Sequence, residues 1–289
     1  MRKLEVRQVD AFTSRPLEGN PAGVVLEAGG LSADEMQAIA SEINCSETAF
    51  LLRPQHGDLR LRYFTRTQEV DLCGHATIAS LQALLEEGRA AGTLTAETRV
   101  GVLELEIGAY GMHWMRQATP RFKDWQDDTG ELLEVLGLTH GDLDPSIPVG
   151  LAYTGLWDLL VPVRDLAALN AAGPDPRRLG AHNRRRGIVS THLFCRETQR
   201  AGSTLHTRDF SPAAGVPEDP HTGTASGALG AYLVKEGVLA PGRHIFEQGW
   251  TVGRPGLIHV DVAEGAATVR VGGQAVTVIA GKFSLPDPA

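Results

Sequence analysis

Two short stretches of the sequence concentrate residue types that can do chemistry. Residues 71–80 read DLCGHATIAS and place Cys73 and His75 on either side of one glycine. Residues 218–227 read EDPHTGTASG and place Asp219 ahead of a similar run. A thiol, an imidazole and a carboxylate can each take up or return a proton, and histidine titrates near neutral pH. Both stretches are therefore candidates for an active site.

Each stretch also opens an expected helix, and a helix N-terminus has unpaired N–H groups that bind carboxylates and phosphates. Glycine in such a turn lets the backbone approach a ligand, and threonine hydroxyls add donors. We expect a small anionic molecule to be held by Gly74, Thr222, Gly223 and Thr224. Asn20, in the sequence GNPAG, is a turn residue and a further candidate for ligand contact.

The two stretches belong to an internal repeat. When residues 57–80 are placed over residues 203–226, a constant offset of 146, seven of 24 positions are identical. Average residue usage gives about one or two identities by chance. At this offset the turn Cys73-Gly74-His75 falls on Asp219-Pro220-His221. The chain therefore contains two copies of one unit.

A third element breaks the repeat. The sequence SEINCSETAF, residues 41–50, places Ser46 and Glu47 between a helix that starts at a predicted Ser32–Glu35 capping box and a strand. At the offset of 146, Leu193 stands where Glu47 would be repeated. An acid without a counterpart in the second half is a candidate for a role of its own.

Strand and helix patterns agree on both sides of the matched stretches. Apolar runs at 48–52 and 187–194 predict strands, and the helices that follow are expected to end at Gly88 and Gly237. Later runs alternate polar and apolar residues, which favours antiparallel strands over β-α-β units. The fold class is therefore α+β: two pseudo-symmetric domains, each a curved antiparallel sheet around a central helix, with an active-site cleft between them.

The domain limits follow from a change in composition. The polar, proline-containing segment 116–130 predicts a linker, so the first domain comprises residues 1–117 and the second residues 118–289. The basic run Arg184 to Arg186 is interpreted as a solvated turn.

Composition excludes several classes of function. The formal charge of −8, from 27 basic and 35 acidic residues, disfavours non-specific binding to nucleic acid. Three widely spaced cysteines without a CxxC pair disfavour a disulfide framework and fit a reducing compartment, and no segment is long and apolar enough for a membrane span. We expect a cytoplasmic protein.

No Walker A or dinucleotide fingerprint is present. Zinc is not expected, because the side chains of Cys73 and His75 point apart in an extended turn.

Five motifs together resemble the PhzF-like family, named for phenazine biosynthesis protein F. They are VDAFTSRPLEGNPAGVV, NCSETAF, DLCGHATIAS, EDPHTGTASGAL and EQGWTVGRPGLIHV, and they span most of the chain. The resemblance implies a diaminopimelate epimerase-like fold, no cofactor and a homodimer. It also implies that the last strand, about residues 275–285, completes the first domain.

The resemblance implies roles for named residues. Glu47 is the expected proton-carrying carboxylate, with His75 and Asp219 beside it. Ser46, Cys73, Gly74, Thr222, Gly223, Thr224 and Asn20 are the expected substrate-binding residues. The expected activity is that of a cofactor-independent isomerase, which moves a proton within a small carboxylate-bearing metabolite by acid and base catalysis.

Two other functions stay open. An amino-acid epimerase or racemase would use Cys73 and Asp219 as unlike bases, although related racemases carry a cysteine as the base in each half and this sequence places Asp219 at that position in the second half. A non-catalytic metabolite-binding or interaction protein could use the same scaffold. For Asp219, the alternative to a catalytic role is that of a helix N-cap.

Overall fold

The structure, a computed structural model, describes residues 1–287 and divides the chain into two compact units. Unit 1 comprises Met1–Arg116 together with Gly272–Ala289, and unit 2 comprises Gln117–Val271. Within residues 1–287, no helix combines the length and the apolar character that crossing a membrane requires.

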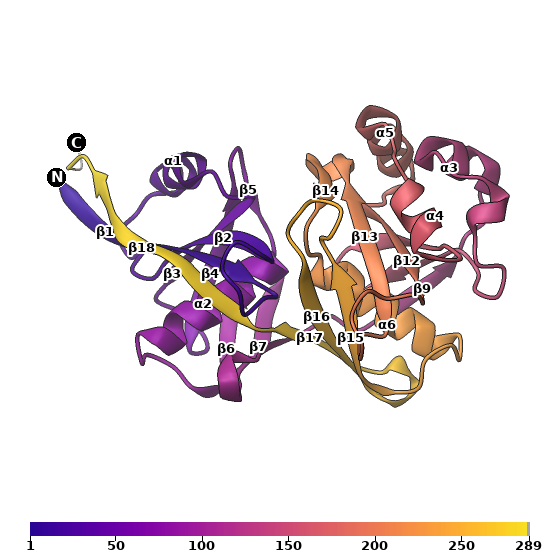
Figure 1. Ribbon diagram of the computed structural model, residues 1–289. Coiled ribbons are helices and arrows are strands. Elements are labelled where there is room, and N and C mark those ends of the chain that lie inside the picture. The colour runs from indigo at the N-terminus through magenta and orange to yellow at the C-terminus, as the bar shows by residue number, and fades with distance from the viewer. Residues whose placement is uncertain (288–289) are drawn as a thin grey trace. The chain divides into compact units, whose positions relative to one another are not determined.

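Unit 1 is a mixed sheet with two helices. Its strands are β1 (Arg2–Ala11), β2 (Asn20–Val25), β3 (Glu47–Leu52), β4 (Leu59–Thr65), β5 (Glu69–Val70), β6 (Gly92–Thr98), β7 (Gly101–Ile107), β8 (His113–Arg116) and β18 (Ala275–Leu285). Its helices are α1 (Ala33–Ile43), α2 (Gly74–Glu86) and the 3-10 turn Ala109–Gly111. The last strand, β18, pairs antiparallel with β1 from Arg2↔Leu285 to Ala11↔Ala275. The two ends of the chain therefore lie side by side in this unit (Figure 1).

Helix α1 forms as the sequence predicts. The Ser32 side chain accepts from the Glu35 N–H while the Glu35 side chain accepts from the Ser32 N–H, which confirms the capping box. The helix buries Met36 and Ile39 against Phe50 of β3 and Phe64 of β4. It ends at Asn44, which adopts the left-handed conformation (φ 59°). This sharp end leads the chain through Ser46 directly into β3.

Helix α2 is the central helix of unit 1. Its residues from His75 to Leu81 are all buried, and its contacts are mainly with β1 and β2. It ends at Glu86, and Gly88 follows with a φ of 64°, as the glycine predicts.

Unit 2 repeats this plan with additional helices. Its strands are β9 (Arg121–Asp124), β10 (Gly150–Tyr153), β11 (Trp157–Pro162), β12 (Ser190–Cys195), β13 (Leu205–Ser211), β14 (Val216–Asp219), β15 (Gly242–Gln248), β16 (Gly256–Val262) and β17 (Val269–Gly273), the last of which runs into unit 1. Its helices are α3 (Thr129–Leu136), α4 (Leu166–Ala171), α5 (Pro176–Arg186) and α6 (Gly223–Lys235), with 3-10 turns at His140–Asp142, Pro212–Ala214 and Glu264–Ala266.

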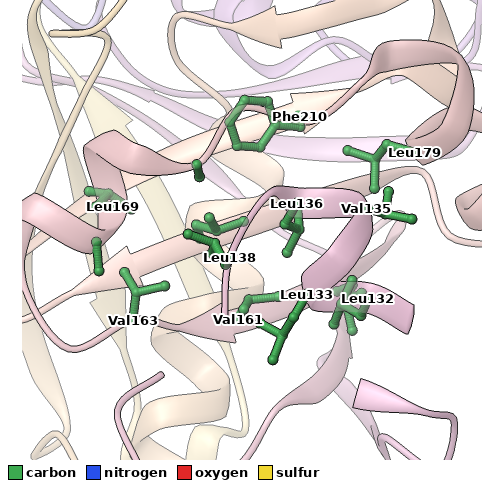
Figure 2. Packing of buried hydrophobic residues seen from close by; sticks show 14 of the residues in the cluster. Leu132, Leu133, Val135, Leu136, Leu138, Val161, Val163, Leu169, Leu179 and Phe210 are labelled. Atoms are coloured by element: carbon green, nitrogen blue, oxygen red, sulfur yellow. The ribbon is translucent and has the colours of Figure 1, made fainter. Parts of the chain in front are cut away.

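Two layers pack on the sheet of unit 2. On one face, Leu132, Leu133 and Leu136 of α3 meet Val161 of β11 in an apolar cluster that also contains Phe210 (Figure 2). Helix α6 packs with β16 and is buried from Gly223 to Leu233. A Cβ atom at Gly230 would lie 2.7 Å from Val260 Cγ1, so a glycine is needed for this close approach.

The sheets are mixed, which differs from the expectation of antiparallel strands alone. Among the strand pairs described for residues 1–287, four are parallel: β2–β3, β4–β6, β11–β12 and β13–β15. Each parallel pair is joined through at least one helix, because a parallel connection must cross back over the sheet. The alternation in the sequence reports which face is buried, and it does not report the direction of the neighbouring strand.

Two local interpretations of the sequence are wrong. Residues 121–124, within the expected linker, form β9, which pairs antiparallel with β10. The run Arg184 to Arg186 lies in the last turn of α5 and not in a turn between elements. There Arg185 and Arg186 form ion pairs with Glu131 of α3, and positive charge suits the C-terminal end of a helix.

The internal repeat is present, but its offset changes along the chain. Strands β4 and β13 start at Leu59 and Leu205, 146 residues apart, as the sequence predicts. Helices α2 and α6 both have 13 residues but start at Gly74 and Gly223, 149 residues apart. The 3-10 turn Pro212–Ala214 adds the three residues before β14. A gapless comparison cannot include such an insertion.

The corrected register changes which residues are equivalent. Tyr63 pairs with Val70 in unit 1, and Asp209 pairs with Asp219 in unit 2, so Asp219 takes the place of Val70 and not of Cys73. At the helix starts, Cys73 and Thr222 are the two N-caps. The matching of His75 with His221 is therefore wrong, and Thr224 takes the place of His75.

The counterpart of Glu47 also changes. Thr48 pairs with Phe64, and Thr191 pairs with Phe210. Since the two phenylalanines are equivalent, the counterpart of Glu47 is the residue before Thr191, which is Ser190, and not Leu193. Glu47 still has no acidic equivalent.

Candidate active site

Glu47 is the first residue of β3, and its neighbours in the sheet fix its position. It pairs with Ala22 of β2 and with Thr65 of β4. Successive side chains of a strand point to opposite faces, and Phe50 lies on the face that packs on α1. Glu47 therefore lies on the other face, toward the first turn of α2, with 17% of its side chain exposed.

The start of α2 brings Cys73 and His75 to Glu47 and its chain neighbour Ser46. The Nε2 atom of His75 lies 3.3 Å from Glu47 Oε2 and 3.2 Å from Ser46 Oγ. The Cys73 Sγ atom lies 3.4 Å from His75 Nδ1 and 3.9 Å from His75 Nε2. Ser46, Glu47, Cys73 and His75 thus form one cluster, which we call the Glu47 cluster.

Burial decides the charge of His75 in this cluster. It lowers the pKa of His75 below its usual value, and the nearby Glu47 carboxylate opposes this effect only in part. A neutral ring has one N–H donor and one acceptor. Because a carboxylate can only accept, the proton belongs on Nε2, facing Glu47, and Nδ1 accepts from the Cys73 thiol.

A buried hydrogen-bond chain holds the backbone of Cys73. The Thr77 hydroxyl donates to the Cys73 carbonyl at 2.7 Å, and the Tyr63 hydroxyl is 2.6 Å from Thr77 Oγ1. Since the single proton of Thr77 is used by the carbonyl, Tyr63 donates to Thr77. Burial raises the pKa of Tyr63, so it keeps its proton. The chain fixes the start of α2 and, with it, the position of His75.

The second predicted group lies in unit 2, at the turn from β14 to α6. Asp219 is the last residue of β14, and its Oδ2 atom accepts from Thr222 Oγ1 at 2.6 Å. Gln248 of β15 donates to the Asp219 carbonyl at 2.9 Å and accepts from the Thr222 N–H at 3.2 Å. Asp219 is not the N-cap of α6, because Thr222 occupies that position.

The other predicted site residues lie at the starts of helices and strands. Gly74 and Gly223 are the first residues of α2 and α6, and Thr224 is buried in the first turn of α6. Asn20 is the buried first residue of β2, two positions before Ala22, the partner of Glu47. The structure thus groups Ser46, Glu47, Cys73, Gly74, His75 and Asn20 in unit 1, and Asp219, Thr222, Gly223 and Thr224 in unit 2.

The starts of α2 and α6 differ from those of the other helices. In α1, α3, α4 and α5 the N-cap side chain accepts a backbone hydrogen bond, and the capping residues are Ser32, Asp128, Asp165 and Asp175. At the starts of α2 and α6, Cys73 and Thr222 make no side-chain cap bond. The two helices that carry the predicted site residues are therefore the two without a side-chain cap.

One reason for expecting no zinc at Cys73 and His75, that their side chains point apart, is wrong. Gly74 already belongs to α2, so the chain turns at Cys73 and the two side chains converge instead of alternating. Ligand atoms of Glu47, Cys73 and His75 all lie within 4.8 Å of one another. Thiolate, imidazole and carboxylate are the ligand types that bind zinc.

Gln248 is a functional candidate that the sequence analysis missed. It is fully buried and holds both Asp219 and Thr222 in place. Gln248 lies in the motif EQGWTVGRPGLIHV, which indicates a functional region of the chain, but the motif assigns no role to any one residue.

Comparison with known proteins identifies the family. Residues 9–281 match the family model described as phenazine biosynthesis-like protein, and the chain belongs to this family. It is 39% identical over 277 residues to an uncharacterized isomerase of Bacillus subtilis, covering 94% of each chain. It is 36% identical over 282 residues to the trans-2,3-dihydro-3-hydroxyanthranilate isomerase of Pseudomonas chlororaphis, covering 93% of this chain and 95% of that one. The protein is accordingly an isomerase of the PhzF family.

Solved structures agree on the fold. A PhzF-family protein of Bacillus anthracis superposes with a TM-score of 0.92 at 37% identity, covering 99% of this chain and 100% of that one. A hydroxyproline epimerase of Agrobacterium vitis is 16% identical with a TM-score of 0.65, covering 98% of this chain and 91% of that one, which shows a shared fold alone. The predicted α+β, epimerase-like fold class is confirmed.

Proposed function

We propose that this isomerase works without a cofactor and moves a proton between two positions of a small, carboxylate-bearing metabolite. Glu47 is the group that takes up the proton and returns it. The observation that carries this proposal is the contact between Glu47 Oε2 and His75 Nε2 at 3.3 Å, in a cluster where burial keeps His75 neutral. A neutral histidine that donates to Glu47 positions the carboxylate without neutralising it.

The start of each of the two buried helices is a candidate binding position for a carboxylate. The first turns of α2 and α6 have no side-chain cap, so their N–H groups suit an anion. Ser46, Cys73, Gly74 and Asn20 in unit 1, and Thr222, Gly223 and Thr224 in unit 2, are the proposed binding residues. Asp219 supports the proton transfer, with its carboxylate oriented by the Thr222 hydroxyl.

Deuterium exchange tests the proposal directly. Trans-2,3-dihydro-3-hydroxyanthranilate, after which the Pseudomonas chlororaphis relative is named, is the first probe. Incubation in D₂O, followed by proton NMR, should show deuterium entering the position that gains a proton. A protein that only binds the probe would exchange nothing, and an epimerase would invert a stereocentre without moving a double bond.

Two variants separate the isomerase from the epimerase alternative. Glu47→Gln should lower kcat by about 10² to 10⁴, because the amide keeps the shape of the side chain but is no base. Cys73→Ala should cost much less, since the thiol serves binding and not proton transfer in this proposal. Loss of activity in Cys73→Ala with retention in Glu47→Gln would transfer the assignment to the epimerase.

The homodimer also remains a proposal that rests on the family resemblance. Sedimentation velocity at micromolar concentration measures it, and a single monomer boundary would contradict it.

A further inference from the structure

We propose that Glu47, Cys73 and His75 form a Zn²⁺ site, and that Zn²⁺ bound there blocks the isomerase reaction. The inhibition rests on the proposed role of Glu47, whereas the binding does not.

The three side chains supply the donor types that Zn²⁺ prefers, namely sulfur, nitrogen and carboxylate oxygen. Tetrahedral zinc with bonds of about 2.0 to 2.3 Å requires its ligand atoms to lie about 3.3 to 3.8 Å apart. In the structure, His75 Nε2 lies 3.3 Å from Glu47 Oε2 and 3.9 Å from Cys73 Sγ. All three ligand atoms fall within 4.8 Å of one another, so rotations of the side chains that bring the ligand atoms about 1 to 1.5 Å closer complete the geometry.

The surroundings favour a metal in two ways. The hydrogen-bond chain from Tyr63 through Thr77 holds the backbone of Cys73, so the sulfur ligand is already in position. Glu47 is the one partly exposed ligand, which leaves a fourth position for water.

Binding is balanced by the loss of one proton. The Cys73 thiol releases its proton to solvent, and the thiolate sulfur forms a bond to Zn²⁺. The His75 proton moves from Nε2 to Nδ1, which no longer accepts from the thiol, and Nε2 becomes the ligand. One proton is therefore released for each Zn²⁺ bound. Zinc affinity should rise with pH, since the thiol must lose its proton.

Bound zinc would occupy the atoms that the reaction needs. The Glu47 oxygen that faces His75 becomes a metal ligand and is no longer available as a base, and the donor N–H of His75 is used up. Zinc here is an inhibitor and not a cofactor.

Cobalt is the spectroscopic probe. Titration of the intact protein with Co²⁺ should give one equivalent bound with a thiolate-to-metal charge-transfer band in the near ultraviolet, and Zn²⁺ should displace it. Cys73→Ser should remove this band, while Cys195→Ser should keep it. Cys195 is the matched control because burial raises the pKa of its thiol to about 12, and it donates to the Glu197 carbonyl.

Two further variants test the other ligands. Glu47→Gln and His75→Gln should each raise the Zn²⁺ dissociation constant at least about tenfold, because loss of an outer-sphere partner alone costs about that much. Circular dichroism melts show whether each variant is folded. If Cys73→Ser does not fold, the site is tested by the wild type and the other two variants. A charge-transfer band in the wild type that weakens in Glu47→Gln and His75→Gln then supports the site. Retention of the band in folded Cys73→Ser, or the absence of stoichiometric binding by the wild type, overturns the site.

The inhibition is measured separately with the deuterium-exchange assay. Zn²⁺ should stop exchange at the concentration that displaces Co²⁺, and excess EDTA should restore it. Exchange that continues with the site saturated would overturn the inhibition and leave the site in place. If the wild type exchanges none of the probe with EDTA present, the proposed function fails, while the cobalt titration still decides the metal site.

Discussion

The starts of β3 and β12 occupy the same place in the two repeats and have opposite character. Glu47 opens β3, is partly exposed and contacts His75. Ser190 opens β12, is buried and donates to Asp158 Oδ1 at 2.9 Å. One scaffold thus presents an acid that solvent can reach in unit 1 and encloses a polar network in unit 2.

Unit 2 has a second set of buried polar contacts on the neighbouring strands, around Asp209. His192 Nδ1 lies 2.9 Å from Asp209 Oδ1, and Ser211 donates to the other Asp209 oxygen at 2.5 Å. In unit 1 the places of His192 and Asp209 are taken by Ala49 and Tyr63, which follows from the strand pairing. The difference shows that a duplicated fold conserves the strand positions, while each copy sets its own chemistry on them.

The largest expected difference between the two positions is in catalysis. Glu47→Gln should lower kcat by about 10² to 10⁴, whereas Ser190→Ala should leave kcat unchanged in the folded protein. Ser190→Ala should instead lower the free energy of unfolding by about 1 to 3 kcal/mol, because Asp158 loses a buried donor. Rates from the exchange assay and urea titrations of both variants measure these effects. An equal loss of rate in both variants would break the contrast.

The equivalent arginines of β4 and β13 should differ in stability. Arg62 binds Glu69 through two nitrogens, and Arg208 binds Glu218 in the same way. Arg208 also donates to the carbonyls of Leu169 and Ala172.

Arg208→Met removes the donor to both carbonyls and the charged partner of Glu218, which keeps only the Thr251 hydroxyl, so it should cost about 3 kcal/mol or more. Arg62→Met should cost about 1 to 2 kcal/mol, because only one carboxylate is affected and Glu69 keeps its ion pair with Arg99. Chemical denaturation compares the two variants. Equal costs would mean that the carbonyl contacts contribute nothing.

The buried carboxyl of Asp158 should make stability depend on pH. Burial raises its pKa well above 3.8, and the negative charge of Asp209 raises it further. Between the unfolded and the folded pKa, the folded state holds more protons than the unfolded state. Stability from this group is therefore complete below about pH 4 and is lost as pH rises through the folded pKa.

Asp158→Asn stays neutral at every pH and should flatten this dependence. The difference in unfolding free energy between the variant and the wild type should move in favour of the variant from pH 4 to pH 7. Urea titrations across this range measure it. A difference that is constant with pH would show that Asp158 is ionised in the folded protein.

The smallest expected effect concerns helix starts, where α1 is capped and α2 is not. Ser32→Ala should lower the unfolding free energy by about 1 kcal/mol, because the capping box is lost. Ser41→Ala is the control: the same change on an exposed position of α1, where no cap is broken. Thermal melts compare the two variants. Equal melting temperatures of Ser32→Ala and Ser41→Ala would show that the Ser32 cap does not stabilise the protein.

Local signals in the sequence were sufficient for much of the architecture. The Ser32–Glu35 pair gave the start of α1, and Gly88 and Gly237 gave the ends of α2 and α6. These features depend on backbone geometry within a few residues, so a short window contains the physical cause. Strand β9 was missed because its residues, RFKD, are polar and mostly exposed, and only pairing with β10 makes them a strand.

The sequence by itself determined the residue types of the site, the presence of two related units and the motifs that carry the resemblance. The tertiary structure decided which of these residues meet. Glu47 and His75 are 28 positions apart in the chain, and a strand end and a helix start bring them within 3.3 Å. The structure also decided which residues are equivalent, because the turn Pro212–Ala214 shifts the register by three. Such facts depend on strand pairing and packing across the fold, which no local pattern of residues encodes.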